Sequence, residues 1–128
     1  MIDASKAYSS FAVPDIDAAK EFYGETLGLE VETLMDGVLL QIDLGGRPVL
    51  VYQKEDHAPA NFTVLNFPVG DVEAAVDELA GRGVEFERYE GFDQDEKGIA
   101  KPQHEGQGPT IAWFTDPARN VLSVHEEM

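Results

Sequence analysis

One stretch of this sequence occurs twice, and the repeat limits the folds that the chain can adopt. The first copy runs from residue 11 to 32 and the second from 67 to 87, with Asp15 in the first copy matching Asp71 in the second. Self-similarity at a fixed offset marks a repeated supersecondary unit. We therefore predict a pseudo-symmetric protein of two modules with a cleft that both modules share.

Each copy begins with a strand of alternating apolar residues that is followed by a helix. In the first copy Asp15 can cap the helix, because its carboxylate accepts from the free amides of the first turn, and Gly28 suits the helix end. Asp36-Gly37 and Gly45-Gly46 then predict tight hairpins, since such residues adopt positive φ easily. The pattern predicts strands at residues 6–13, 29–35, 38–44, 47–53, 61–69, 84–90, 110–115 and 120–126, and helices at 16–27 and 72–80.

This order of elements predicts an α+β fold class, with tandem βαβββ modules that form an incomplete barrel-like sheet around a cleft. We expect a single domain over residues 1–128, with module one at 1–53, a polar linker at 54–60 and module two at 61–128. The symmetry fails where a long polar connection, 91–109, replaces the two-residue turn of module one. Loops of this length inside a compact domain are usually functional or mobile.

Composition removes several classes of protein. The chain has no cysteine, so disulfides, thiolate metal ligands and a cysteine nucleophile are excluded. No apolar run approaches the ~20 residues of a membrane span, and the first residues lack the apolar core of a signal peptide. We therefore expect a cytoplasmic protein with no membrane partner.

The charge balance is strongly acidic, with 25 acidic and 9 basic residues and a net charge of −16. This balance argues against nucleic acid as a partner, because binding to phosphates needs a basic surface. An acidic surface raises the local concentration of a cationic ligand. The simpler interpretation is solubility, or adaptation to a salty cytoplasm that screens the repulsion. Charge alone does not identify a ligand.

Several motifs of the chain resemble those of the vicinal oxygen chelate superfamily. They are Val13-Pro14-Asp15-Ile16-Asp17, Phe22-Tyr23, Leu27-Gly28-Leu29-Glu30-Val31, Gly70-Asp71-Val72-Glu73-Ala74-Ala75 and Phe114-Thr115-Asp116-Pro117-Ala118-Arg119-Asn120. That family includes glyoxalase I, extradiol dioxygenases, epimerases, thiol transferases that inactivate fosfomycin, and bleomycin-resistance binding proteins. Its members commonly dimerise, so the resemblance implies a homodimer. A fold with so many activities leaves the function open.

The resemblance also implies where a metal site would lie. In catalytic members four ligands, usually His and Glu, project into the cleft from the first and last strand of each module. In this chain those positions are Tyr8, Leu50 or Val51, Val64 and Ser123. Neutral Tyr and Ser are poor ligands, and aliphatic side chains cannot bind a cation. We therefore predict no metal at this site and no cofactor.

The turn before the last strand also departs from the family. The family usually has Gly where this chain has Arg119. If the residue keeps a left-handed conformation, a non-Gly side chain costs on the order of 1 kcal/mol. Either the turn differs or the cost is tolerated.

The three histidines have no partner at metal-ligand spacing. His125 shares a strand face with Ser123, so it is a candidate displaced ligand or general base, although a histidine at the rim is the simpler interpretation. His57 lies in the linker, where a solvated side chain is expected. His104 lies in the long loop near Glu105 and other acids, where it would form a weak metal site only if the loop folded over the cleft.

Strand alternation assigns eight side chains to the lining of the cleft. They are Tyr8, Ser10, Gln41, Tyr52, Asn66, Trp113, Ser123 and His125. Apolar walls with a few hydrogen-bonding groups are typical of small-molecule pockets. Trp113 is either a core residue or an aromatic wall for a planar or cationic ligand.

Three functions fit these observations, and whether the chain is an enzyme stays open. The preferred hypothesis is metal-independent binding and sequestration of a small amphipathic molecule, with a cation favoured, similar to the bleomycin-resistance proteins. The first alternative is a glyoxalase- or dioxygenase-like metalloenzyme with a relocated site. The second is an acidic interaction module that binds a basic partner protein.

Overall fold

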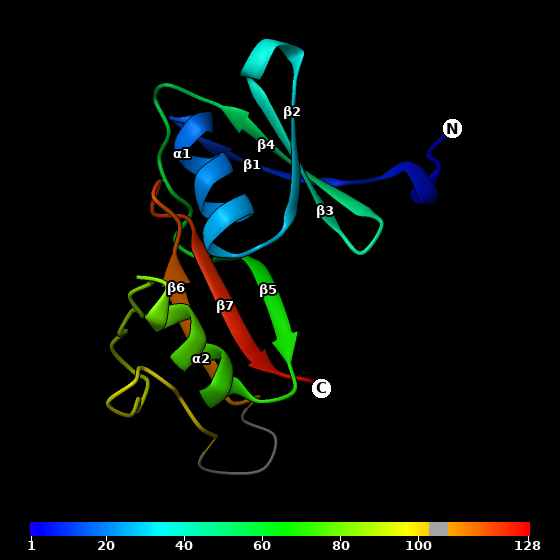
Figure 1. The fold of residues 1–128 in the computed structure, drawn as a ribbon. Helices are drawn as coiled ribbons and strands as arrows, with labels where there is room; N and C mark the ends of the chain where they lie inside the picture. The colour runs from blue at the N-terminus through cyan, green and yellow to red at the C-terminus, as the bar shows by residue number, and fades with distance from the viewer. Residues whose placement is uncertain (103–107) are drawn as a thin grey trace. The chain divides into compact units, whose positions relative to one another are not determined.

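The computed structural model describes residues 1–102 and 108–128 and divides the chain into two compact units, Met1–Pro59 and Ala60–Met128. Each unit is an open sheet with a helix on one face (Figure 1). This arrangement confirms the α+β class, with two open sheets in place of a closed barrel. The division between the units falls inside the linker predicted at 54–60. No helix among the described residues is long and apolar enough to cross a membrane.

The first unit contains a four-stranded sheet in the order β1-β4-β3-β2. Strand β1 pairs with β4 in parallel, and the other neighbours are antiparallel. The elements are η1 (Ala4–Lys6), β1 (Ser9–Val13), α1 (Ile16–Lys20), η2 (Glu21–Thr26), β2 (Glu30–Leu34), η3 (Met35–Gly37), β3 (Leu39–Leu44) and β4 (Arg47–Gln53). The strand predicted from residue 6 begins only at Ser9, because Asp3 accepts from Ser5 N at 3.0 Å and caps the short turn η1.

Helix α1 covers the face of this sheet that carries Phe11 and Val13, as the alternation predicted. Asp15 accepts a hydrogen bond from Ala18 N at 3.2 Å, so the predicted cap is confirmed. The helix packs on β3 and β4, in front of the sheet in Figure 1. The buried side chains of this layer are Val13, Ile16, Ala19, Tyr23, Leu40, Ile42, Val49 and Val51.

The helix predicted to run to Leu27 changes pitch halfway. Residues 21–26 form a π-helical turn, η2, in which Leu27 N donates to Phe22 O at 2.9 Å. Gly24 lies in this turn, and a Cβ there would stand 3.0 Å from Val31, so the glycine allows β2 to approach closely. Gly28 ends the element with a φ of 72°, which confirms the predicted cap.

The two predicted hairpins differ in their turns. Gly45 and Gly46 have φ of 66° and 91°, and Asp43 accepts from Gly46 N at 2.6 Å, which confirms a tight turn. The other turn is larger than its Asp-Gly pair predicts. Positive φ begins one residue earlier, at Met35 with 51°, and the three residues form η3.

The second unit contains a three-stranded sheet in the order β5-β7-β6. Its elements are β5 (Thr63–Val69), α2 (Val72–Gly81), β6 (Ile111–Thr115) and β7 (Val121–Glu126). Asp71 accepts from Ala74 N at 3.0 Å and caps α2, as predicted. Helix α2 packs on β7 and β6 (Figure 1). The buried side chains of this layer include Val72, Val76, Ala112, Phe114, Leu122 and Val124.

The strand predicted at 84–90 is wrong. Only Phe86 bridges to Phe114 on β6, followed by a hydrogen bond from Glu87 N to Trp113 O at 2.8 Å. The chain then leaves the edge of β6 and returns at residue 100. There Ala100 exchanges two backbone hydrogen bonds with Ile111, at 2.8 and 3.0 Å. We call residues 88–99 the edge loop.

A glutamine side chain explains why this stretch does not form a strand. The Gln94 amide accepts from Tyr89 N at 2.9 Å and donates to Glu87 O at 2.9 Å and to Gly98 O at 2.7 Å. These backbone groups therefore bond to one side chain in place of a neighbouring strand. Because buried backbone groups need partners, this exchange lets the chain leave the sheet.

The last turn of the second unit is built around Asp116. Its carboxylate accepts from Ala118 N and Asn120 N, both at 2.9 Å, and from Asn120 Nδ2 at 3.0 Å. Arg119 keeps a left-handed φ of 72° inside this turn. Of the two outcomes that the sequence left open, the turn is therefore retained and the cost is tolerated.

Candidate functional site

One row of side chains crosses the face of the second sheet that α2 does not cover. The strand register aligns Asn66 on β5, Ser123 on β7 and Trp113 on β6. Ser123 Oγ donates to Asn66 Oδ1 at 2.6 Å, so the hydroxyl group and the amide oxygen are paired within the row. The alternation argument therefore placed these three predicted lining residues on a common face.

His125 lies in the next row of the same face, between Pro68 and Ile111. The simpler expectation of a rim histidine is wrong, because the residue is only 5% exposed. Its Nδ1 lies 2.7 Å from Glu126 O, and a carbonyl only accepts, so Nδ1 carries the proton. In the neutral ring Nε2 is then an acceptor.

Trp113 forms the centre of an aromatic cluster. Its ring centroid lies 5.5 Å from that of Tyr89 and 4.8 Å from that of Phe92, in edge-on and tilted arrangements. Trp113 is only 8% exposed, whereas Phe92 is 54% exposed. Burial raises the pKa of the Tyr89 phenol, and the Glu87 carboxylate adds to the shift. The edge loop thus supplies two rings that cover the tryptophan.

A cavity of about 550 Å³ opens beside this cluster. Its described lining is aromatic and aliphatic, with one carboxylate and one ammonium group. The lining residues are Gly91, Phe92, Asp93, Ala100, Lys101, Pro102, Pro109, Ile111 and Trp113. Asp93 and Lys101 are exposed while Trp113 is buried, so the charged groups lie toward solvent and the apolar surface lies deeper.

Sequence reasoning found only Trp113 among the residues that line this cavity. Phe92, Asp93 and Lys101 all lie in the connection at 91–109, for which no path was predicted. Ile111 was placed on β6 but was not chosen as a lining residue. The available signal was two aromatic residues, Tyr89 at the end of the predicted strand and Phe92 at the start of the polar connection.

The predicted lining residues of the first unit lie on its own open sheet face. The register aligns Ser10, Leu50 and Gln41 in one row, and Tyr52 stands one row further along. Tyr8 precedes β1 and is 59% exposed. The role of these residues in ligand binding, and the cleft predicted to be shared by both modules, stay predictions.

The four positions that the family uses for metal ligands do not offer a donor set. Of the pair considered on β4, Leu50 faces the open side and Val51 is buried on the side of α1. Ser123 is fully buried and bonded to Asn66, and Val64 lies where the register of β5 shifts. An aliphatic pair, a phenol and an engaged hydroxyl do not fit a divalent cation.

The other candidate metal ligands are not brought together by the described part of the chain. Within residues 1–102 and 108–128, no three His, Asp or Glu side chains gather in a group that could hold a metal ion. His57 is partly buried, and its Nε2 has no hydrogen-bond partner among the described residues, contrary to the solvated side chain expected. His104 and Glu105 lie outside the described residues.

The two open sheets, each with a helix, define the class of proteins that are built from two related βαβββ modules. Comparison with known proteins identifies the family. The chain belongs to the Glyoxalase/Bleomycin resistance protein/Dioxygenase superfamily, whose family model matches residues 7–124. The resemblance to the vicinal oxygen chelate superfamily is thereby confirmed. A comparison with curated proteins found no significant match.

Similar solved structures cover nearly the whole chain. A glyoxalase family protein from Enterococcus faecalis shares 21% identity over 97% of both chains, with a TM-score of 0.64. The fosfomycin resistance protein FosX from Mesorhizobium loti shares 11% identity over 100% of this chain and 95% of its own, with a TM-score of 0.67. A lactoylglutathione lyase from Agrobacterium tumefaciens shares 21% identity over 98% of this chain and 95% of its own, with a TM-score of 0.61. At these identities the likeness shows the fold alone.

Proposed function

We propose that this protein binds a small amphipathic molecule in the cavity beside Trp113 and does so without a metal ion. The observation that carries the proposal is the aromatic cavity of about 550 Å³, which is of the size and composition of small-molecule sites. Membership of a superfamily that includes bleomycin-resistance proteins is consistent with binding in place of catalysis.

Electrostatics favour a ligand that carries positive charge. The net charge of −16 raises the local concentration of cations around the protein. Trp113 and Phe92 line the cavity, and a cation that lies over the face of an aromatic ring gains about 0.5 to 2 kcal/mol. Asp93 adds a carboxylate to the lining, while Lys101 restricts where a second positive group can lie.

A matched pair of probes tests the preference for charge. Benzyltrimethylammonium and its neutral isostere neopentylbenzene have nearly the same shape and differ by one charge. We expect the cation to change the fluorescence of Trp113, the only tryptophan, and to bind about fivefold more tightly than the isostere. Equal binding of the two probes would remove the electrostatic part of the proposal.

A matched pair of variants tests the place of binding. Phe92→Ala removes a lining ring that is 54% exposed, whereas Phe62→Ala removes a 66% exposed ring outside the lining. We expect only Phe92→Ala to weaken binding of the cation, by about tenfold, because a wall of the site is lost. If both variants bind like the wild type, or if no amphiphilic cation binds at all, the site is wrong.

Metal content tests the remaining part of the proposal. Protein purified without chelator should contain less than about a tenth of an equivalent of divalent metal, because its donor set is poor. Added divalent cations should not raise its melting temperature. One equivalent of bound metal that is lost in His125→Ala would instead support a relocated metal site and an enzyme.

A further inference from the structure

The edge loop has little apolar anchorage of its own. Every residue from Tyr89 to Lys97 is exposed or only partly buried, and burial becomes complete only at Gly98 and Ile99. Segments with few buried apolar contacts open at low free energy unless polar contacts hold them. The loop nevertheless carries Tyr89 and Phe92, the two rings that cover Trp113.

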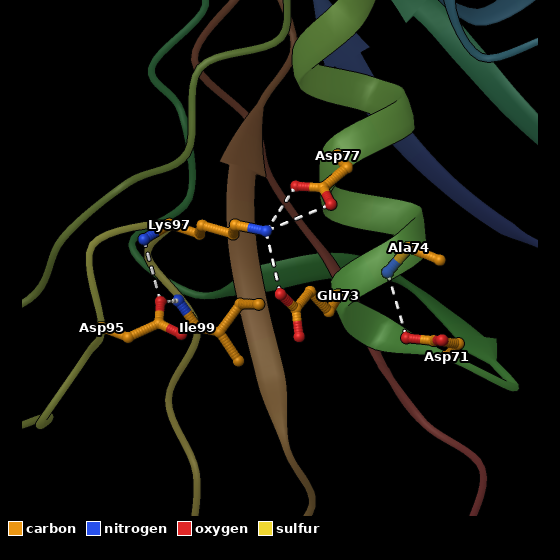
Figure 2. Close-up of polar contacts among 7 residues, drawn as sticks. All are labelled: Asp71, Glu73, Ala74, Asp77, Asp95, Lys97 and Ile99. Atoms are coloured by element: carbon orange, nitrogen blue, oxygen red, sulfur yellow. Dashed lines mark hydrogen bonds and ion pairs between the residues drawn. The ribbon is translucent and has the colours of Figure 1, made fainter.

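A lysine side chain connects this loop to the helix of its unit. Lys97 Nζ lies 2.9 Å from Glu73 Oε1 and 2.9 Å from Asp77 Oδ1, and both carboxylates stand on α2. Figure 2 shows the lysine extended from the loop toward the helix, with its ammonium group between the two acids. Glu73 and Asp77 are four residues apart on one helix face, where like charges repel, so the lysine also relieves that repulsion.

The loop is shaped so that Lys97 is presented to the helix. Asp95 Oδ1 accepts from Lys97 N and from Ile99 N, both at 2.9 Å, and closes a tight turn around the lysine (Figure 2). Arg88 Nη2 holds the opposite side of the turn through the carbonyls of Asp95 and Glu96, at 2.7 and 2.9 Å. These hydrogen bonds define the turn, and Lys97 extends from it to the two carboxylates of α2.

We propose that Lys97 is a positioning residue that fastens the edge loop to α2 and so keeps Phe92 in place as a wall of the cavity. This inference rests on the proposed function, because the contact of Lys97 with α2 would hold closed the wall of the binding site proposed above. Since Glu73, Asp77 and Lys97 are all partly exposed to solvent, the contact is weakened by salt. Affinity for a ligand in the cavity therefore falls as ionic strength rises.

The first test needs no ligand. Acrylamide quenching of the single tryptophan reports how well Trp113 is covered. In Lys97→Met, which removes the charge and keeps most of the length, we expect the quenching constant to rise about twofold, because the loop opens more often. Lys54→Met is the matched control, since it removes a lysine that pairs with Asp56 at 2.8 Å in the other unit. An unchanged constant in Lys97→Met would overturn the positioning role, whatever the protein binds.

The second test uses benzyltrimethylammonium as the probe. Lys97→Met should bind it more weakly, by at most about fivefold, because the loss of two partly exposed ion pairs lowers the closed-to-open equilibrium constant of the loop by about that factor. Raising the salt from about 0.05 M to about 0.5 M should weaken binding more in the wild type than in Lys97→Met. Lys97→Arg, which keeps the charge, should restore both the affinity and the full salt response.

The results separate the two proposals. Greater quenching in Lys97→Met with no probe bound by any variant supports the fastening role and contradicts the proposed function. Probe binding with the same affinity and salt response in wild type and Lys97→Met supports the function and contradicts the role of Lys97. A loss of affinity that Lys97→Arg does not restore would contradict a role that depends on the charge of Lys97.

Discussion

The two units begin with similar sequences, but their structures differ in the stretch that follows the helix. Both have an Asp-capped helix on one face of a sheet, and in both the first strand pairs in parallel with the last. In the first unit the strand after the helix, β2, pairs along its whole length with β3. In the second unit the equivalent stretch makes one bridge, at Phe86, and then becomes the edge loop.

This difference shows that alternation alone does not make a strand. Both stretches alternate, but β2 leads through a short turn into its partner β3, and residues 84–87 lead into a long connection. Without a hairpin to fix the register, the side chain of Gln94 satisfies the backbone groups that a strand would have used. In the first unit the stretch after the helix therefore completes the sheet. In the second unit it continues into the edge loop, which forms a wall of the cavity.

The largest expected effect comes from a glycine substitution that breaks the edge loop. Gly98 has a φ of 87°, and a Cβ there would lie 3.1 Å from Phe86 Cβ. Gly98→Ala should lower the free energy of unfolding by about 2 to 3 kcal/mol, from backbone strain and crowding together. Chemical denaturation followed by Trp113 fluorescence measures this loss.

A glycine of the first unit is the control for that change. Gly45 has a φ of 66°, but a Cβ there would meet nothing within 4 Å. Gly45→Ala should therefore cost only the strain, about 1 kcal/mol. Equal losses in the two variants would mean that the edge loop is not packed against Phe86 as described.

The next effect concerns the matching helix caps. Asp15→Ala and Asp71→Ala each remove an acceptor for an amide of the first turn, so each should cost about 1 kcal/mol. Only Asp71 caps the helix that carries Glu73 and Asp77 (Figure 2). We therefore expect acrylamide quenching of Trp113 to rise in Asp71→Ala and not in Asp15→Ala. A rise in both variants would mean that the quenching of Trp113 follows the overall stability of the protein and does not depend on α2 in particular.

The parts of the fold that were predicted correctly are those that local residues determine. Asp15, Asp71 and Gly28 act through neighbouring backbone groups, and Gly45-Gly46 sets its own turn, so these signals can be read in the sequence. The apolar spacing did not predict the π-helical turn at 21–26, in which Gly24 lies so close to Val31 that an added Cβ would stand 3.0 Å from it. That contact joins two elements and leaves no periodic pattern.

The candidate site could be predicted only on the strands, where side chains alternate between the two faces of the sheet. Alternation placed Asn66, Trp113 and Ser123 on one face, and the register confirms that row. It could not find Phe92, because the path of the edge loop is set by side-chain hydrogen bonds of Gln94. It also gave no sign that His125 would be buried, since a position near the end of the chain suggested a rim.

A smaller effect is expected in the last turn of the second unit, where a non-glycine residue has a positive φ. In the Gly45-Gly46 turn of the first unit, glycines occupy such positions. Arg119 has a φ of 72°, and its guanidinium lies 3.7 Å from Glu87 with most of its side chain exposed. Arg119→Gly should raise the free energy of unfolding by about 0.5 kcal/mol, because relief of strain exceeds both a weak ion pair and the added backbone entropy. A destabilised variant in urea denaturation would show that the Glu87 contact matters more than the strain.

The smallest expected effect compares one lysine from each unit. Hydrogen bonds to Asp77 and then to Glu73 raise the pKa of Lys97, and a hydrogen bond to Asp56 raises the pKa of Lys54. A raised pKa gives a stabilising contribution that is complete below the ordinary lysine pKa and is lost as the pH rises through the raised value. The fastening of the edge loop should therefore not weaken between about pH 8 and about pH 10. Titration of the lysine side chains by NMR should place Lys97 above Lys54, because two carboxylates hold the first and one holds the second. If Lys97 titrated together with Lys54, the ammonium group would not be held between Glu73 and Asp77 in solution.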